Sequence, residues 1–183
     1  MVAVIGGVDL TDPVATHLAF EQANERLQGL DGLVNVAGGF RWETLEEGSL
    51  DAWDALYAMN LRSTVVACRE AVPRLLNVGG ASIVNVGALA AQKAGMGMGA
   101  YAASKAGVAR LTEALAEELK DRDVRVNAVL PSILDTPANR ADMPDSDATR
   151  WVAPRALAAV IAFLLSTDAS AVTGACVPVA GRV

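Results

Sequence analysis

The sequence predicts an α/β fold in which helices cover both faces of a parallel sheet. Short runs of β-branched residues alternate with long, alanine-rich segments of helical periodicity, and this alternation is typical of strand–helix–strand units. The chain has 183 residues, of which 52% are hydrophobic. That length can bury one full core, so we expect a single domain over residues 1–183.

Five short apolar runs predict the strands of the sheet. Each is rich in Val, Ile or Leu, as strands buried on both faces are, and each is bounded by glycine, proline or polar residues. The expected strands cover residues 2–5, 32–37, 82–86, 124–130 and 175–181.

Four helical segments separate these strands. The first is expected to begin at Pro13, after cap residues at 11 and 12, and to direct Val14, Leu18 and Leu27 inward. The others are expected over about 49–76, 100–120 and 153–166. The polar loop between the fourth strand and the last helix is either a mobile flap or a surface loop without a role.

Composition argues against several classes of partner. The formal net charge is −6 and the 15 Lys and Arg residues are spread thinly, so we expect no nucleic-acid partner. The apolar stretch at 156–165 is shorter than the roughly 20 residues of a membrane helix, and no export signal is evident. We therefore expect no membrane partner and a cytoplasmic location. The single histidine, His17, argues against a metal site or a Ser-His-Asp triad. Cys68 and Cys176 are expected to be buried thiols in a reducing compartment.

Tyr101 and Lys105 are the clearest candidates for chemistry. They lie four residues apart at the start of a predicted helix that follows a strand, and ligands of parallel sheets bind beyond the carboxyl ends of the strands. A nearby ammonium favours the phenolate and lowers the pKa of a tyrosine, which suits general acid and base catalysis. A YxxxK pattern alone occurs by chance in roughly one such chain in three, so its context decides.

That context consists of several motifs in a fixed order. They are VDLTD at 8–12, NVAG at 35–38, AMNL at 58–61, YAASK at 101–105, LPSILDTP at 130–137 and TGACVPVAG at 173–181. Together they resemble the short-chain dehydrogenases/reductases, which are single-domain, Rossmann-like, NAD(P)-dependent oxidoreductases. The resemblance covers essentially the whole chain and implies a Rossmann-like fold, NAD or NADP as the cofactor, and a small-molecule substrate.

The resemblance also implies a role for particular residues. Tyr101 would be the acid/base, Lys105 would bond the nicotinamide ribose and lower the tyrosine pKa, and Asn60 would hold a water in the proton relay. Ala88 and Met96 would lie on the substrate side. The remaining cofactor-binding residues implied are Asp9, Asn35, Ala37 and Gly38 on the adenine side, and Pro131, Ile133 and Thr136 at the nicotinamide.

Ala88 departs from the family pattern, because that position normally carries a serine whose hydroxyl holds the substrate oxygen. Loss of such a donor typically costs about two to three orders of magnitude in rate. Ser82 and Ser104 do not replace it convincingly. The dihydropteridine reductases resemble this chain in having alanine there. The substrate is thus expected to be a small carbonyl or alcohol, or an activated pterin-like compound.

The second departure lies at the start of the chain. In the family, a strand, a GxxxGxG turn that binds the diphosphate and a helix come first, and a second strand–helix unit follows, about 60 residues in all. We expect the fold to lack these two units. The Gly6–Gly7 pair lacks the spacing of that turn. We expect residues 2–5 to pair directly with residues 32–36 instead.

Three hypotheses about function remain open at this stage. The first is an NAD(P)-dependent oxidoreductase. The second is an inactive fragment of a longer enzyme. The third is a non-enzymatic interaction protein that keeps the helix surfaces of the family. The resemblance also implies a homo-oligomer, a dimer or tetramer, formed through the helices near 52–77 and 101–119.

Overall fold

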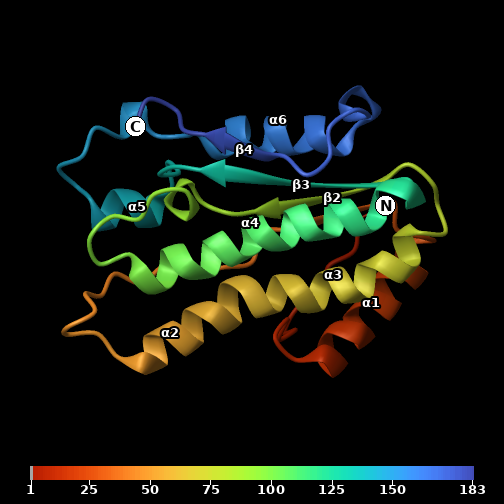
Figure 1. The fold of residues 1–183 in the computed structure, drawn as a ribbon, viewed down its shortest axis with the longest axis horizontal. Helices are drawn as coiled ribbons and strands as arrows, with labels where there is room; N and C mark the ends of the chain where they lie inside the picture. Colours follow the sequence, from red (N-terminus) through yellow and green to blue (C-terminus); the bar gives the residue numbers. More distant parts are fainter. Residues whose placement is uncertain (1) are drawn as a thin grey trace.

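The computed structural model describes residues 2–183, and its centre is a four-stranded parallel sheet (Figure 1). The strands follow one another across the sheet in chain order, so each neighbour is also the next along the sequence. Val34 lies opposite Val84 in the first pairing, and Val84 lies opposite Asn127 in the second. The strands are β1 (Gly32–Asn35), β2 (Ala81–Val86), β3 (Val124–Pro131) and β4 (Cys176–Val179).

Helices cover both faces of this sheet, which confirms the predicted fold class. On one face α3 packs against β1 and α4 against β3, whereas α6 packs against β2 and β3 on the other face (Figure 1). Helix α1 lies on α3, and a π-helix at Tyr57–Arg62 joins α2 to α3. The α-helices are α1 (Pro13–Leu27), α2 (Leu50–Leu56), α3 (Ser63–Leu75), α4 (Gly99–Leu119), α5 (Pro137–Asp142) and α6 (Pro154–Leu165).

The core divides between the two faces because successive strand side chains point in opposite directions. Ile83 and Val126 are fully buried in a cluster with Leu75 of α3. Val84 and Val129 are equally buried, and they pack in a second cluster that includes residues of α6. Both faces of β2 and β3 are therefore covered, as the unbroken apolar runs of these strands predict.

The strand expected at residues 2–5 does not form, and its pairing with residues 32–36 is wrong. The segment passes near β1 without joining the sheet, and Val2 and Val4 are almost fully exposed. Arg26 of α1 donates a hydrogen bond to the Val4 carbonyl at 3.4 Å. The β-branched run at residues 2–5 shows that β-propensity by itself does not produce a strand, because a strand also needs its side chains packed against neighbours.

Helix α1 begins where expected, but it buries a different face. Asp12 caps it by accepting a hydrogen bond from the Val14 amide at 2.8 Å. Val14 and Leu18 are 68% and 56% exposed, and Leu27 is also exposed, so the prediction that these three point inward is wrong. Thr16 is buried, and Ala19, Phe20 and Ala23, which lie on the same side of the helix, are partly buried.

Two further segments differ from the predictions in detail. The helical region expected over 49–76 forms without a gap, but its middle part, Tyr57–Arg62, is a π-helix that separates α2 from α3. The loop expected after β3 contains α5, whose first turn Thr136 caps by accepting a hydrogen bond from the Asn139 amide at 3.2 Å.

Within residues 2–183, no helix combines the length and the apolar character needed to span a membrane.

Candidate active site

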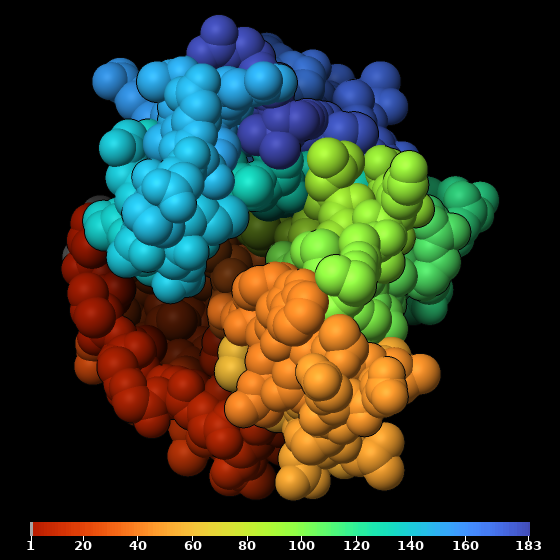
Figure 2. Space-filling view, turned by 90° about the vertical axis from the view of Figure 1, so that its left-hand side faces the viewer, coloured from red at the N-terminus to blue at the C-terminus, as the bar shows by residue number. Residues whose placement is uncertain are grey.

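A cavity of about 610 Å³ opens at the carboxyl ends of the strands. Figure 2 looks onto this end of the molecule and shows a hollow ringed by the orange, green and cyan parts of the chain. The volume is within the range of small-molecule sites. Its lining comes from the segments after three strands and from the first turns of α4 and α5. The lining residues are Val36, Gly38, Gly39, Phe40, Val86, Gly87, Ala88, Leu89, Ala90, Met98, Tyr101, Lys105, Pro131, Ser132, Ile133, Leu134, Thr136, Asn139 and Met143.

Lys105 reaches this cavity from the second turn of α4. Its ammonium donates a hydrogen bond to the Val86 carbonyl, the last of β2, over 2.9 Å. The residue is 5% exposed, and burial lowers the pKa of its amine to about 8 because the charged form loses its hydration. Among the lining residues of the described chain it is the one charged side chain.

Tyr101 lies one turn earlier on α4 and lines the same cavity. Its ring meets Phe40 edge to face, with centroids 4.9 Å apart. Burial raises the pKa of its phenol. The expectation that Lys105 lowers this pKa is not met, because the lysine bonds to Val86 and burial dominates at the tyrosine. The phenol is therefore protonated at neutral pH and can donate a proton.

Asn60 lies behind the cavity wall, in the π-helix, and is fully buried. Its side-chain oxygen accepts from the Gly39 amide at 2.8 Å, and its side-chain nitrogen donates to the Gly39 carbonyl at 3.1 Å and to Ser104 Oγ at 2.9 Å. Ser104 Oγ in turn donates to the Tyr101 carbonyl at 2.7 Å. The asparagine side chain thus fixes the turn after β1 against the first turns of α4.

Gly38 allows this close approach. A Cβ atom at this position would lie 2.7 Å from Asn60 Oδ1 and 3.0 Å from Lys105 Nζ. The missing side chain keeps open the space beside the lysine ammonium. Pro131 at the end of β3, and Ile133 and Thr136 after it, line the same cavity.

Three cofactor-side predictions fall outside the cavity. Asp9 is exposed before α1, where its carboxylate accepts from the Thr11 amide and hydroxyl, and these bonds lower the pKa of Asp9. Asn35 donates to Asn85 Oδ1 at 2.8 Å within the sheet. Ala37 is exposed and does not line the cavity. The structure thus brings Gly38, but not these three, to the lysine.

Met96, expected on the substrate side, does not line the cavity. It is 81% exposed, and its carbonyl accepts a hydrogen bond from Trp42 Nε1 at 2.9 Å. Met98 and Met143 line the cavity instead. Met98 could have been found, since it precedes Tyr101 by three residues and lies on the same helical face. Met143 gives no local signal, because the loop that carries it is positioned by contacts distant in sequence.

Phe40 is a further residue that the sequence interpretation missed. It follows the Gly38–Gly39 turn directly after β1, at the end of the sheet where ligands bind. This position at the carboxyl end of the sheet could have identified Phe40 as a candidate site residue from the sequence. Its ring completes the wall beside Tyr101.

Ala88 lines the cavity, as predicted, and offers only a methyl group there. The two serines considered as replacements face elsewhere. Ser82 Oγ donates to the Leu164 carbonyl at 3.1 Å, and Ser104 is used by Asn60 and Tyr101. The Tyr101 hydroxyl makes no hydrogen bond to any residue of the range 2–183, which leaves it available to a ligand.

Comparisons with known proteins identify the family of the chain. Residues 2–181 match a family model described as enoyl-(acyl carrier protein) reductase. The chain is 34% identical to a probable short-chain type dehydrogenase/reductase of Bradyrhizobium diazoefficiens, over 94% of this chain and 66% of that protein. It is 35% identical to a D-threitol dehydrogenase of Mycolicibacterium smegmatis, over 91% and 68%.

A solved structure shows the same fold. The ligand-free aldohexose dehydrogenase of Thermoplasma acidophilum superposes with a TM-score of 0.87 at 28% identity, over 95% of this chain and 75% of that one. The chain therefore belongs to the short-chain dehydrogenase/reductase family, and its sheet is of the Rossmann-like type. It spans about two thirds of the length of the curated relatives named above.

Proposed function

We propose that the chain carries the catalytic part of an NAD(P)-dependent oxidoreductase that transfers hydride between a nicotinamide and a small carbonyl or alcohol. One observation carries the proposal. Tyr101, with a free hydroxyl, and Lys105, with a buried ammonium, converge on one cavity at the carboxyl end of a parallel sheet. The names of the relatives, which are dehydrogenases and reductases, support it.

The coenzyme is NAD or NADP. Gly38, Lys105, Pro131, Ile133 and Thr136 would hold its nicotinamide end, since they line the space beside the lysine. When bound, the nicotinamide supplies or accepts the hydride. A GxxxGxG turn does not occur within residues 2–183. The adenine-side roles of Asp9, Asn35 and Ala37 remain predictions.

Tyr101 supplies the proton in this proposal. Because burial raises the pKa of its phenol, the hydroxyl is protonated at neutral pH and donates to the developing substrate alkoxide during reduction. In the oxidative direction the same oxygen accepts the proton.

The walls of the cavity indicate the substrate class. Phe40, Leu89, Met98, Leu134 and Met143 are apolar, so they favour an uncharged substrate with an apolar part. Ala88 leaves Tyr101 as the hydroxyl donor to the substrate oxygen, which favours a substrate that is already activated. A pterin-like compound fits the second argument but finds few polar partners in these walls, so an apolar, activated ketone fits both better.

A homo-oligomer is a further part of the proposal. Large apolar side chains are exposed along α2 and the π-helix, among them Leu50, Trp53 and Tyr57. They lie on the helices that the family resemblance assigns to subunit contact. Exposed patches of this kind mark interaction surfaces.

The decisive experiment is a titration of the purified 183-residue chain with NADH and NADPH, followed by fluorescence and calorimetry. Saturable binding in the micromolar range, followed by turnover of an apolar ketone, is expected. The Tyr101→Phe chain is the matched control, which should bind coenzyme equally and turn over far more slowly. An absence of saturable binding below millimolar coenzyme would reject an independent enzyme and favour the inactive-fragment hypothesis.

A further inference from the structure

The segment that follows β1 runs beside the beginning of α4 and contacts it at successive residues. Gly38 lies next to Lys105, and Phe40 meets the ring of Tyr101 edge to face, with centroids 4.9 Å apart. Trp42 then reaches the turn that precedes α4. Each contact lies nearer the amino-terminal end of α4 than the one before it, so the two segments run in opposite directions. The last contact of the series, made by Trp42, lies outside the cavity wall.

Trp42 is held on that turn by two hydrogen bonds. Its Nε1–H donates to the Met96 carbonyl at 2.9 Å, and the amide of the next residue, Glu43, donates to the Gly97 carbonyl at 3.0 Å. Because neighbouring residues of both segments take part, the bonds fix the direction of the turn as well as its position. We call this pair of contacts the Trp42 clamp.

Gly97 allows the indole ring to lie directly on the backbone of the turn. Its φ of +72° falls in the left-handed region, which glycine adopts at little steric cost. A Cβ atom at this position would lie 2.7 Å from Trp42 Cδ2 and closer still to two other ring atoms. The clamp therefore requires a residue without a side chain at position 97, and the chain supplies one.

Met98 directly follows the clamp and carries its effect into the cavity. It is the N-terminal cap residue of α4, and its carbonyl accepts a hydrogen bond from the Ala102 amide at 2.7 Å. Helix caps usually bind the first turn through a side-chain oxygen, which methionine lacks. The start of α4 is thus positioned by contacts of the preceding turn, and the clamp provides two of them. The Met98 side chain lines the cavity three residues before Tyr101, on the same side of the helix.

The turn separates two methionines that have opposite surroundings. Met96 is 81% exposed, whereas Met98 lines the cavity. A methionine side chain is unbranched and flexible, so its place in a wall depends on how firmly its backbone is held. Release of the clamp would let the turn rotate, withdraw Met98 and widen the cavity beside the Tyr101 hydroxyl.

We propose that Trp42 is a positioning residue that sets substrate specificity, because its clamp holds Met98 in the cavity wall beside Tyr101 and so limits the width of the substrate there. Trp42 acts through Met98 and does not itself line the cavity. The substituent that it selects against is a bulky group attached to the carbonyl on the Met98 side. This kinetic consequence rests on the proposed oxidoreductase function, whereas the clamp is a property of the chain alone.

Diacetyl and benzil, two activated diketones of small and large width, probe the specificity of the purified chain with NADH and NADPH. Trp42→Ala should raise the ratio of kcat/KM for benzil to kcat/KM for diacetyl at least about tenfold, since roughly one methylene of extra room in an apolar pocket changes discrimination by this much. The change should lie mainly in the KM for benzil. A loss of structure alone would lower kcat/KM for both diketones and leave the ratio unchanged.

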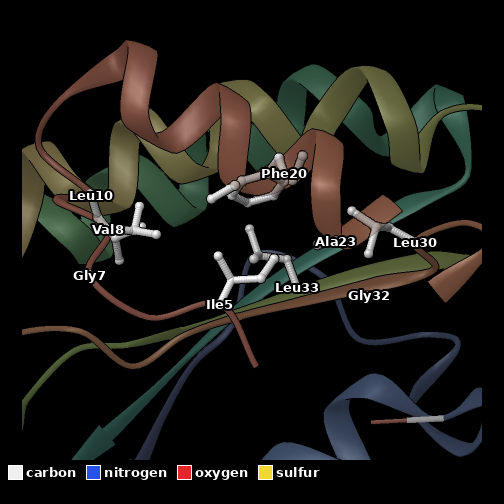
Figure 3. A pocket seen from close by; sticks show the side chains of 11 residues that line it. Ile5, Gly7, Val8, Leu10, Phe20, Ala23, Leu30, Gly32 and Leu33 are labelled. Carbon is white, nitrogen blue, oxygen red and sulfur yellow. The ribbon is translucent and has the colours of Figure 1, made fainter. Parts of the chain in front are cut away.

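Phe20→Ala is the matched control for the loss of an aromatic ring. The Phe20 ring points from α1 toward β1, as Figure 3 shows, and it does not line the active-site cavity. Its removal should lower the thermal midpoint without changing the ratio. The proposal is overturned if Trp42→Ala leaves the ratio at the parent value, or if Phe20→Ala changes the ratio equally.

Two measurements test the clamp without turnover. Hydrogen exchange at the Glu43 amide should be about fivefold faster or more in Trp42→Ala, because that amide loses the neighbouring bond that holds it on the turn, whereas β3 amides should change little. Gly97→Ala should lower the urea midpoint in the parent, where the new Cβ meets the indole, and lower it less in the Trp42→Ala chain, where the ring is absent. Circular dichroism checks that each variant is folded.

The outcomes separate this proposal from the proposed function. A parent chain that reduces neither diketone would contradict the proposed function, and faster exchange with unequal midpoint losses would then still support the positioning role of Trp42. Unchanged exchange at Glu43, together with equal midpoint losses from Gly97→Ala in both backgrounds, overturns the clamp in an active or an inactive chain.

Discussion

Lys105 Nζ lies 2.9 Å from the Val86 carbonyl oxygen, so an ammonium on α4 is tied to the last residue of β2 in a nearly dry place. One hydrogen bond donated to a carbonyl does not replace the hydration that the charge has lost, and the pKa of the lysine falls to about 8. The lysine is therefore held ready for a ligand at a cost to the stability of the free chain.

That cost should appear in the pH dependence of unfolding. The unfolded chain holds the Lys105 proton up to the ordinary lysine pKa of 10.5, while the folded chain releases it near 8, so stability rises with pH between about 8 and 10.5. Lys105→Met should remove this rise and stabilise the chain at pH 7 by up to about 3 kcal/mol, less the lost hydrogen bond. Urea unfolding of both chains at pH 7 and pH 10 checks this, and equal pH dependence would contradict it.

Tyr101→Phe should abolish most turnover without disturbing the fold. The substitution removes one hydroxyl that makes no hydrogen bond within residues 2–183, and it keeps the edge-to-face contact with Phe40. Loss of a positioned acid typically costs about 10²–10⁴ in rate. Steady-state kcat with the thermal midpoint as the control measures it. A kcat within tenfold of the parent would remove Tyr101 from the reaction.

Ala88→Ser should restore a second donor at the substrate oxygen. The methyl of Ala88 lines the cavity, so the added hydroxyl reaches the same space as Tyr101. Because one preorganised donor is worth about 10²–10³ in rate, we expect at least a tenfold gain in kcat/KM on an unactivated ketone. An activated substrate should gain much less. Equal gains on both substrates would show that Ala88 does not select for activation.

Gly38→Ala should destabilise the site, because the new Cβ would lie 2.7 Å from Asn60 Oδ1 and 3.0 Å from Lys105 Nζ. We expect a loss of about 1–3 kcal/mol in the free energy of unfolding and weaker coenzyme binding. Gly6→Ala is the matched control, since nothing lies within 4 Å of a Cβ there. If the two variants unfold at the same denaturant concentration, the close contact at Gly38 is not a constraint.

Ser104→Ala should loosen the link between Asn60 and Tyr101. The buried Asn60 side-chain nitrogen loses one of its two acceptors, and the Tyr101 carbonyl loses a donor. We expect about 1–3 kcal/mol of destabilisation in chemical unfolding. Ser170→Ala, at an exposed serine, should change stability by less than about 0.5 kcal/mol. Matching losses in the two variants would argue against the link.

Much of the site could be read from the sequence because its residues follow strands directly. The carboxyl ends of parallel strands meet at one edge, so Gly38, Ala88 and Pro131 had to lie near the start of α4 and hence near Tyr101 and Lys105. The same argument could not show which of Met96 and Met98 lines the cavity. Both precede the helix, and which of them faces the cavity depends on where Trp42 binds the turn.

By itself, the sequence determined the alternation of strands and helices, the parallel sheet between two helical layers, and the order of the family motifs. These features follow from hydrophobic periodicity, helix-capping residues and the spacing of motifs, each of which is set by residues close together in the sequence. Only the tertiary structure decided that residues 2–5 stay outside the sheet and that Asn60 fixes the turn after β1. It also decided that α1 buries Thr16 and partly buries Phe20, while Val14 and Leu18 are exposed. These outcomes depend on what lies opposite each residue in space, because burial and hydrogen-bond partners are supplied by segments distant in the chain.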